Sequence, residues 1–388
     1  MRIIFAGGGT GGHLFPGIAL AQELFLSKEI GEKKLLFLCT NKPFDQQQLS
    51  RYKLDYQALP SPRLPALKNP LSILKFLINL IISLYYTHKY FRRFKPEVVI
   101  GLGGYGSFSP LTIAILRGIP FALLEQNVLP GKITRFFSPF ARYVFCQWDK
   151  SAKYLRNRKI IRSTGSPIRK EILLSATDSS YDNKANARKQ LDLTKEYILL
   201  VIGGSQGAEA INKTMIDNID ALKKVSDRLG IIHLTGEREH QRVKDTYKKT
   251  GIEAVVKPFS EEMNIIYSAS DFALSRAGGI AIAEMAMFGL PMILVPYPNA
   301  ADNHQFFNAL EVQQSGAGVI INQDNLSQKI EIVVKEFLRM QSSSGYAVPE
   351  ADPPLAETKT LKLKEPSQHA KSLARDKAAR IILNYLRC

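Results

Sequence analysis

Short apolar runs alternate with helix-like stretches along this chain, and the alternation begins a second time near its middle. The first series is "RIIFA", "KLLFLC", "EVVIG", "PFALL" and "YVFC", and the second is "YILLVIG", "IIHLT", "EAVVK", "DFALS" and "PMILVP". Short runs rich in Val, Ile, Leu and Phe, with helices between them, are typical of buried parallel strands in βαβ units. We therefore expect an α/β chain with two doubly wound, Rossmann-like parallel-sheet domains.

A polar, charged stretch at about residues 175–196 separates the two series and is predicted to be a linker running into a helix. The chain has 388 residues, enough for an N-terminal domain over 1–170 and a C-terminal domain over 171–368. Ser, Pro, Glu and Lys dominate residues 341–369, where we expect a disordered loop. Residues 370–388 show helical apolar spacing, and this last helix could pack back on the N-terminal domain.

Each series opens with a strand that runs into a glycine-rich loop. The first loop is "GGGTGGH", Gly7–His13, and the second is "GGSQGA", Gly203–Ala208. Glycines between a strand and a helix let the backbone approach a ligand closely, and the free N–H groups of the helix N-terminus favour phosphate. The alternative is a tight strand-to-helix turn that binds nothing.

The first loop also fits the dinucleotide fingerprint G-x-G-x-x-G. That fingerprint requires an acidic residue after the second strand, to bind the ribose of NAD. Thr40, Asn41 and Lys42 stand there instead, which weakens the NAD hypothesis. Neither loop is followed by the Gly-Lys-Ser/Thr of a Walker motif.

Further polar and glycine-rich segments follow other predicted strands. They are "GLGGYGSFS" at 101–109, Glu125–Asn127, and Gly278–Gly279 with Glu284 in the helix that follows. Because ligands bind beyond the carboxyl ends of parallel strands, we expect a ligand in a cleft between two facing domains. A carboxylate such as Glu284 can bind a ribose diol, although it could also be a solvated helix residue.

The chain is basic, with 52 Lys and Arg against 35 Asp and Glu and a formal net charge of +17, which predicts an anionic partner. Nucleic acid is disfavoured as that partner, because the sequence has no RNP-type aromatic motif, zinc spacing or basic recognition helix. Cys39, Cys146 and Cys388 show no disulfide or metal-ligand spacing, which indicates a reducing compartment. No signal-peptide pattern precedes the first strand.

Residues 69–86, "NPLSILKFLINLIISLYY", are predicted to form an apolar helix with a polar stripe at Lys75, Asn79 and Ser83. A membrane-spanning helix needs about 20 mainly apolar residues, and this run is shorter and interrupted. Residues 51–95 hold nine Lys or Arg and a single acid. An apolar helix beside a basic cluster suits docking on an anionic membrane surface, whereas packing on the sheet is the simpler alternative.

The motifs "GGGTGGHLFPGIALA", "GLGGYGS", "EQN", "GSPIR", "GGSQGAEAINK", "SRAGGIAIAE" and "GLPMILVPYPNAADNHQFFNA" occur in this order over nearly the whole chain. In them the chain resembles the MurG family, the UDP-N-acetylglucosamine transferases of peptidoglycan synthesis. The resemblance implies a GT-B fold and an inverting transfer without metal or cofactor. GlcNAc would move from UDP-GlcNAc to the MurNAc C4 hydroxyl of undecaprenyl-linked lipid I, forming lipid II. It also implies a peripheral enzyme at the cytoplasmic face of the bacterial inner membrane, acting in cell-wall synthesis, cell shape and cell division with other cell-wall synthesis proteins.

The resemblance further implies which residues bind UDP-GlcNAc. Those in the N-terminal half border the sugar or reach the phosphates: Thr10, Gly11, Gly12, Asn127 and Arg169. Those in the C-terminal half meet the phosphates, ribose, uracil and sugar hydroxyls: Ser205, Ser260, Gly279, Ile280, Ala281, Ile282, Ala283, Glu284 and Gln305. One departure is Leu124, which stands where the family often has histidine.

An inverting transfer needs one base to take the proton of the attacking hydroxyl. His13 is the first candidate, since it ends the first glycine loop and histidine titrates near neutral pH. Glu125 is the second candidate, and a purely structural role for His13 is the alternative. A different glycosyltransferase of the same fold, acting on a glycolipid or an antibiotic, is the closest rival function.

Overall fold

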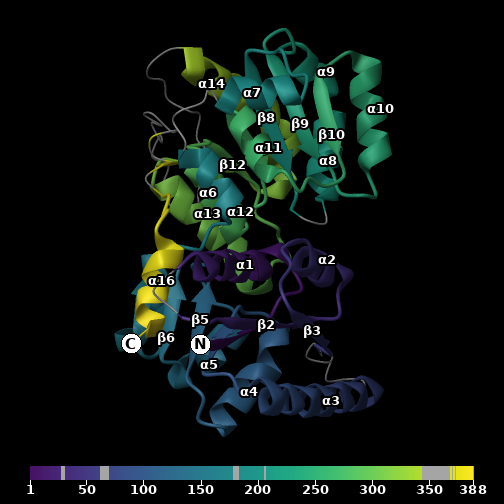
Figure 1. Ribbon diagram of the computed structural model, residues 1–388. Coiled ribbons are helices and arrows are strands. Elements are labelled where there is room, and N and C mark those ends of the chain that lie inside the picture. Colours follow the sequence, from purple (N-terminus) through teal and green to yellow (C-terminus); the bar gives the residue numbers. More distant parts are fainter. Residues whose placement is uncertain are drawn as a thin grey trace. The chain divides into compact units, whose positions relative to one another are not determined.

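The computed structural model describes residues 1–27, 31–61, 70–177, 183–204, 207–342, 368, 370, 371 and 373–387. The chain divides into two compact units, each built on a parallel sheet covered by helices (Figure 1). Unit 1 comprises Met1–Lys170 and Arg375–Cys388, and unit 2 comprises Glu171–Ala374. The two parallel sheets confirm the predicted α/β class.

Unit 1 has a seven-stranded sheet in the order β3-β2-β1-β4-β5-β6-β7, and every neighbouring pair is parallel. The strands are β1 (Arg2–Ala6), β2 (Lys34–Thr40), β3 (Tyr56–Leu59), β4 (Val98–Gly101), β5 (Phe121–Glu125), β6 (Tyr143–Cys146) and β7 (Ile161–Ser163). Alternate side chains of these strands enter two separate hydrophobic cores, one on each face.

The helices of unit 1 cover both faces of its sheet. On one face pack α1 (Gly11–Leu26), α2 (Pro43–Arg51) and α16 (Ala378–Arg387); on the other pack α3 (Pro70–Phe94), α4 (Phe108–Leu116) and α5 (Lys132–Phe137). The C-terminal α16 is part of unit 1, where Ile382 and Leu383 are buried. The Arg162 guanidinium lies over both the Tyr143 and the Tyr385 ring, 5.4 and 5.0 Å from their centroids, and so ties α16 to the sheet.

Unit 2 has a six-stranded parallel sheet in the order β10-β9-β8-β11-β12-β13. The strands are β8 (Tyr197–Ile202), β9 (Leu229–Leu234), β10 (Ala254–Lys257), β11 (Phe272–Ser275), β12 (Met292–Leu294) and β13 (Gly318–Ile320). The helices are α6 (Lys170–Thr177), whose first residue belongs to unit 1, α7 (Asn183–Gln190), α8 (Glu209–Asp217), α9 (Ile219–Lys223), α10 (His240–Thr250), α11 (Met263–Ala269), α12 (Gly279–Met287), α13 (His304–Gln314) and α14 (Leu326–Ser342).

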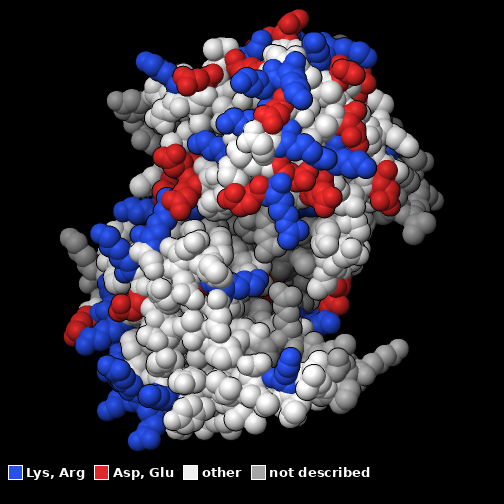
Figure 2. All heavy atoms as spheres, turned by 90° about the vertical axis from the view of Figure 1, so that its right-hand side faces the viewer, with Lys and Arg blue, Asp and Glu red and all other residues white. Residues whose placement is uncertain are grey.

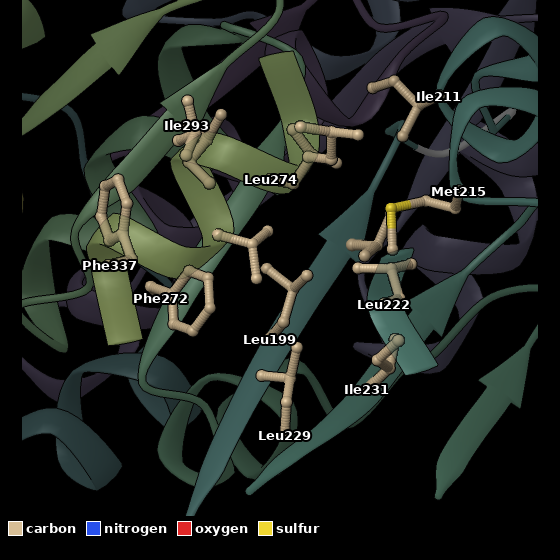
Figure 3. Packing of buried hydrophobic residues seen from close by; sticks show 14 of the residues in the cluster. Leu199, Ile211, Met215, Leu222, Leu229, Ile231, Phe272, Leu274, Ile293 and Phe337 are labelled. Carbon is tan, nitrogen blue, oxygen red and sulfur yellow. The ribbon is translucent and has the colours of Figure 1, made fainter. Parts of the chain in front are cut away.

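Figure 3 shows a core of unit 2, where α8, α9, α10 and α14 pack on one face of the sheet. Phe272 of β11 stacks on Phe337 of α14, with ring centroids 5.3 Å apart. Leu199, Leu229 and Ile231 fill the space between these rings and the α8 and α9 side chains. Such dense apolar packing is the main source of stability of each unit.

All ten predicted strands are confirmed, and three strands were missed. The missed strands, β3, β7 and β13, have only three or four residues each, and β3 and β7 lie at the edges of their sheet. The predicted C-terminal helix over 370–388 is interrupted, because Ala370 and Lys371 are helical, residues 373–377 are not, and α16 begins at Ala378. The predicted linker overlaps the end of α6, and α3 continues beyond the predicted segment to Phe94. The predicted disordered loop at 341–369 lies mostly outside the described residues; Gln341 and Ser342 belong to α14.

The strand order of each sheet reverses at one point, and this point is equivalent in the two sheets. In unit 1 the reversal lies between β1 and β4, and in unit 2 it lies between β8 and β11. Helices connected to these strands leave toward opposite faces, which opens a crevice at the carboxyl ends where ligands of such sheets bind. The glycine loops predicted from sequence follow these four strands.

Candidate active site

In unit 1 the glycine loop after β1, Gly7–Gly12, lies beside the loop after β4. Leu102 N donates a hydrogen bond to Ala6 O over 2.8 Å, and the Ser107 hydroxyl donates to the same carbonyl over 2.7 Å. A Cβ atom at Gly7 would lie 2.6 Å from Ser107 Oγ, so no side chain fits there. The two loops therefore form one continuous surface at the carboxyl edge of the sheet.

His13 lies in the first turn of α1 and rests on the loop after β4. Its Nδ1 atom is 3.2 Å from Thr10 Oγ1. Thr10 is the N-cap residue of α1 but makes no side-chain capping bond, so its hydroxyl is directed to the imidazole instead. Cβ atoms at Gly103 and Gly104 would lie 3.0 and 3.3 Å from atoms of the ring, so these two glycines leave room for it. The half-buried imidazole is thus positioned from both sides.

Glu125, at the end of β5, is buried and serves as an internal acceptor. It accepts hydrogen bonds from Asn127 N at 3.0 Å, Asn127 Nδ2 at 3.2 Å and Gly131 N at 3.0 Å. Burial raises the pKa of the Glu125 carboxyl above its usual range, and these hydrogen bonds oppose that rise. Its contacts hold the loop that carries Asn127.

Arg169 follows the "GSPI" turn and is also buried in unit 1. Its guanidinium lies over the Phe15 ring of α1, 4.0 Å from the centroid. A Cβ atom at Gly11 would lie 2.8 Å from the same ring, so Gly11 leaves room for Phe15. Gly11, Phe15 and Arg169 therefore form one packed group beneath the exposed residues Thr10 and Gly12.

In unit 2 the glycine loop after β8 rests on the end of β9. Gly207 has a φ of +74°, and a Cβ atom there would lie 2.2 Å from Thr235 O. Ser205, predicted to contact the phosphates, lies outside the described residues. Asn212 Nδ2 donates to the same Thr235 carbonyl over 2.9 Å, and Asn212 Oδ1 lies 3.0 Å from His233 Nε2.

The helix α12 follows β11 at the neighbouring position in the sheet. Its N-cap is Gly278, beside which a Cβ atom would meet nothing within 4 Å. No acidic residue occupies the first turn, so the positive end of the helix dipole is not neutralised locally. Ile280 and Ile282 are buried in the core and could offer a ligand only their backbone, whereas Ala281 and Ala283 are half-buried.

Glu284 lies one turn into α12 and is buried. The Tyr267 hydroxyl donates to its Oε2 over 3.1 Å, which fixes the orientation of the carboxylate. Ser260 is buried after β10, where its hydroxyl accepts a hydrogen bond from Glu262 N at 3.2 Å. The described residues of unit 2 that were predicted to bind UDP-GlcNAc thus lie in loops and helices at the carboxyl edge of its sheet.

Arg276 is a residue that the sequence-based prediction missed. Its buried guanidinium donates to Val295 O at 3.1 Å, Pro296 O at 3.3 Å and Gln323 Oε1 at 2.6 Å, and burial lowers its pKa. It therefore anchors the loop in which Tyr297 N donates to Gln305 Oε1 over 2.9 Å. The sequence signal that could have identified Arg276 is its position directly after a predicted buried strand.

Within the described parts of the chain, no three His, Cys, Asp or Glu side chains are grouped so that they could hold a metal ion. Charged groups at the carboxyl edges include His13 and Arg169 in unit 1 and Glu284 in unit 2, together with loop and helix N–H groups. Helix N-termini can bind phosphate, and a histidine can remove a proton from a hydroxyl.

Comparison with known proteins places this geometry in a family. The N-terminal domain of glycosyltransferase family 28 matches residues 3–146, and the C-terminal domain of that family matches residues 198–364. A UDP-N-acetylglucosamine--N-acetylmuramyl-(pentapeptide) pyrophosphoryl-undecaprenol N-acetylglucosamine transferase from Thermodesulfovibrio yellowstonii is 35% identical, over 87% of this chain and 90% of the relative. The enzyme of the same name from Caldanaerobacter subterraneus is 34% identical, over 87% and 92%.

Solved structures show the same fold. The crystal structure of Acinetobacter baumannii MurG has a TM-score of 0.70 and 22% identity, over 100% of this chain and 99% of that one. UDP-GlcNAc 2-epimerase from Neisseria meningitidis, bound to UDP-GlcNAc, has a TM-score of 0.67 at 15% identity, over 100% of both chains. The relatives match over most of their length, and the chain belongs to glycosyltransferase family 28, with the MurG enzymes.

Proposed function

We propose that the protein transfers GlcNAc from UDP-GlcNAc to the MurNAc C4 hydroxyl of lipid I and so forms lipid II for peptidoglycan. The observation that carries the proposal is the match over about nine tenths of the length of relatives that bear this activity in their name. The geometry supports it, because both units present glycine loops at the strand-order reversal of their sheet. We assign the acceptor to unit 1 and the nucleotide to unit 2.

The donor is proposed to bind along the carboxyl edge of unit 2. The loop after β8 and the N-terminus of α12 offer N–H groups to the diphosphate, and the Glu284 carboxylate accepts hydrogen bonds from the ribose diol. Ser260 N is assigned to uracil and Gln305 to sugar hydroxyls. Charge that builds on the departing UDP is then stabilised by these N–H groups and by Arg169.

His13 is proposed as the base that deprotonates the acceptor hydroxyl as it attacks the anomeric carbon. With Nδ1–H donated to Thr10, Nε2 is the ring nitrogen that we assign to take the proton of the acceptor hydroxyl. The C4 hydroxyl oxygen forms the new bond to the anomeric carbon, its proton passes to Nε2, and the bond to UDP breaks. Thr10, Gly11, Gly12 and Asn127 are assigned to the sugar side of this reaction.

Membrane association is supported by α3, which by length and composition alone could cross a membrane between Leu71 and Phe94. It also packs on unit 1: Ser83, Thr87 and Phe91 are buried, so Ser83 does not belong to an exposed polar stripe. The opposite surface of α3 exposes large apolar side chains: Leu71, Leu74, Leu77, Ile78, Ile81, Ile82, Tyr85 and Tyr86. One face is therefore anchored in protein while the other is unusually apolar.

The surroundings of this exposed face are basic. Lys75, Lys89, Arg92 and Arg93 are exposed on α3 itself. On the face drawn in Figure 2, unit 2 carries many interleaved positive and negative side chains, whereas unit 1 shows a broad area with few charged side chains. We propose that α3 lies on the cytoplasmic leaflet of the inner membrane, where each basic residue near the surface contributes about 1 kcal/mol.

Vesicle flotation tests this docking. Burial of each large apolar side chain is worth roughly 1.5–3 kcal/mol, so Leu74→Glu with Ile81→Glu should weaken partition onto anionic vesicles by more than about tenfold. The control is Ile332→Glu, an exposed isoleucine on α14 of unit 2, which should float like the wild type. Equal flotation of all three proteins would refute docking through α3.

The activity itself is tested with UDP-GlcNAc and a short-chain lipid I analogue, followed by mass spectrometry of the product. The expected result is one added GlcNAc and one UDP released per acceptor consumed. UDP-glucose and UDP-GalNAc serve as competing donors, and an acceptor lacking MurNAc serves as the control. Turnover of a glycolipid or antibiotic acceptor in place of the lipid I analogue would favour the rival function.

A further inference from the structure

A carboxylate is buried directly beneath the first glycine loop. It belongs to Asp45 in α2, whose side chain is fully buried. Both of its oxygens lie 2.8 Å from Gly9 N, and Oδ2 also accepts from Thr40 N at 3.1 Å and from the Thr40 hydroxyl at 2.6 Å. A Cβ atom at Gly8 would lie 2.5 Å from Oδ2, so the loop is wrapped tightly around this carboxylate.

The other polar group of Gly9 is held from the same chain segment. Lys42 Nζ donates to Gly9 O over 2.6 Å. Gly9 has a φ of +89°, a conformation that glycine adopts readily and other residues rarely. Asp45 therefore holds the N–H of Gly9, and Lys42 holds its carbonyl. Without these contacts the glycine backbone could adopt many conformations.

This fixed segment leads straight to the proposed base. Thr10 follows Gly9, and its Oγ1 lies 3.2 Å from Nδ1 of His13. The direction of the Thr10 side chain depends on the backbone that precedes it. A chain of short contacts thus runs from Asp45 and Lys42 through Gly9 and Thr10 to the imidazole.

We propose that Asp45 and Lys42 are positioning residues for His13: they set Gly9 so that Thr10 engages Nδ1 and orients the imidazole. Asp45 is fully buried, so it acts through the loop and not on a substrate. The inference rests on the proposed function, in which His13 is the base. Misplacement of a catalytic group by about 1 Å can cost a large factor in rate.

Asp45→Asn tests the proposal with almost no change in shape. The amide group would direct N–H donors at the N–H of Gly9 or at the two donors of Thr40. We expect kcat to fall roughly 10- to 100-fold while KM for UDP-GlcNAc changes less than about twofold. The control is Asp55→Asn, an exposed aspartate of the same unit, which should leave both constants unchanged.

Lys42→Met is the second variant, because the Lys42 side chain is only half-buried and its loss leaves the Asp45 bonds intact. It should lower kcat in the same way but by a smaller factor, about threefold to tenfold. This variant keeps the proposal testable if Asp45→Asn fails to fold.

Histidine NMR of the substrate-free protein gives a readout that does not depend on activity. The chain has six histidines, and the His13 signal is identified by its loss in His13→Gln. We expect ring ¹⁵N shifts of a single tautomer in the wild type and of a mixture in Asp45→Asn and Lys42→Met. Unchanged His13 shifts and unchanged kcat in both variants would overturn the inference. Full turnover of His13→Gln would instead refute the base role in the proposed function, and the NMR shifts would still decide whether Asp45 positions the ring.

Discussion

The two glycine loops occupy equivalent positions in the two units, but the groups that support them differ in kind. The first loop follows β1 and is wrapped around the Asp45 carboxylate. The second follows β8 and rests on the carbonyl of Thr235, which Asn212 also holds. Asn212 and Tyr247 contact His233, and burial lowers the pKa of that imidazole to about 3, so the group stays neutral.

The difference in support separates the roles of two loops that look alike in sequence. In the first loop the N–H of Gly9 already donates to the Asp45 carboxylate and the Gly9 carbonyl already accepts from Lys42, so neither group is left for a phosphate. Among the described residues, Gly207 of the second loop rests on Thr235, which Asn212 and the neutral His233 support, and the neighbouring strand leads into the positive end of α12. We therefore assign the diphosphate to the second loop and the base to the first.

The largest expected effect is a loss of turnover, and it tests whether the two loops have separate functions. His13→Ala should lower kcat by roughly 10²- to 10⁴-fold, the usual contribution of a general base. UDP affinity measured by calorimetry should stay within about threefold, since the nucleotide is assigned to unit 2. If affinity and kcat fell together, the separation of the two loops would be lost.

Glu284→Gln should show the opposite pattern. Hydrogen bonds to a charged group are worth about 1.5–3 kcal/mol, so UDP should bind roughly 10- to 100-fold more weakly. Tyr267→Phe removes only the hydroxyl that orients the carboxylate and should weaken binding by a smaller factor. Wild-type UDP affinity in Glu284→Gln would exclude a ribose contact.

A pair of glycine substitutions tests the supports directly. Gly8→Ala and Gly207→Ala each place a methyl group against the atom beneath, Asp45 Oδ2 at 2.5 Å or Thr235 O at 2.2 Å. Both should lose about 1–3 kcal/mol of stability in urea unfolding. Gly8→Ala should reduce kcat, whereas Gly207→Ala should reduce UDP affinity.

The control for this pair is Gly118→Ala, which also has a positive φ, +64°, but meets nothing within 4 Å. It should cost about 1 kcal/mol of stability for the backbone conformation alone, with unchanged kinetics. Kinetic changes of the same kind in all three variants would mean that the supports have no distinct roles.

The smallest expected effect is the pH dependence of stability that comes from His233, which contacts Asn212 beneath the second loop. The unfolded chain protonates histidine near pH 6.5, but His233 in the folded protein does so only near pH 3. The neutral imidazole therefore makes its full contribution to the free energy of unfolding above about pH 6.5, and this contribution is lost as the pH falls toward 3. Between pH 7 and pH 5.5 the loss is about 1 kcal/mol. Urea unfolding at the two pH values should therefore show a smaller difference for His233→Gln than for the wild type, and equal differences would show that the imidazole is not held neutral.

Sequence patterns predicted the sheets and the loops well because both depend on local signals. Buried parallel strands are continuous apolar runs, and strand-to-helix turns need glycine, so β1, β8 and the loops after them were identified. The strands β3 and β7 were missed because "YQAL" and "IRS" are short, polar edge strands. Nothing in a run such as "YQAL" distinguishes it from a loop until a neighbouring strand pairs with it.

The supports beneath the loops could not be predicted, because they join residues far apart in the chain. Asp45 lies 36 residues from Gly9, in a polar helix that by pattern alone resembles a solvated one. Arg276 anchors carbonyls about 20 residues away. Such contacts depend on how the loops of neighbouring strands meet, and periodicity carries no information about that.

The anomeric configuration of the product shows directly whether the transfer is a single displacement, as the proposed reaction requires. UDP-GlcNAc is the α-linked donor, so one displacement must give a β-linked disaccharide. Proton NMR of the product made with the short-chain lipid I analogue distinguishes the two linkages by the coupling of the anomeric proton. We predict β-GlcNAc on the MurNAc C4 oxygen; an α-linked product would show that the transfer does not proceed by one displacement.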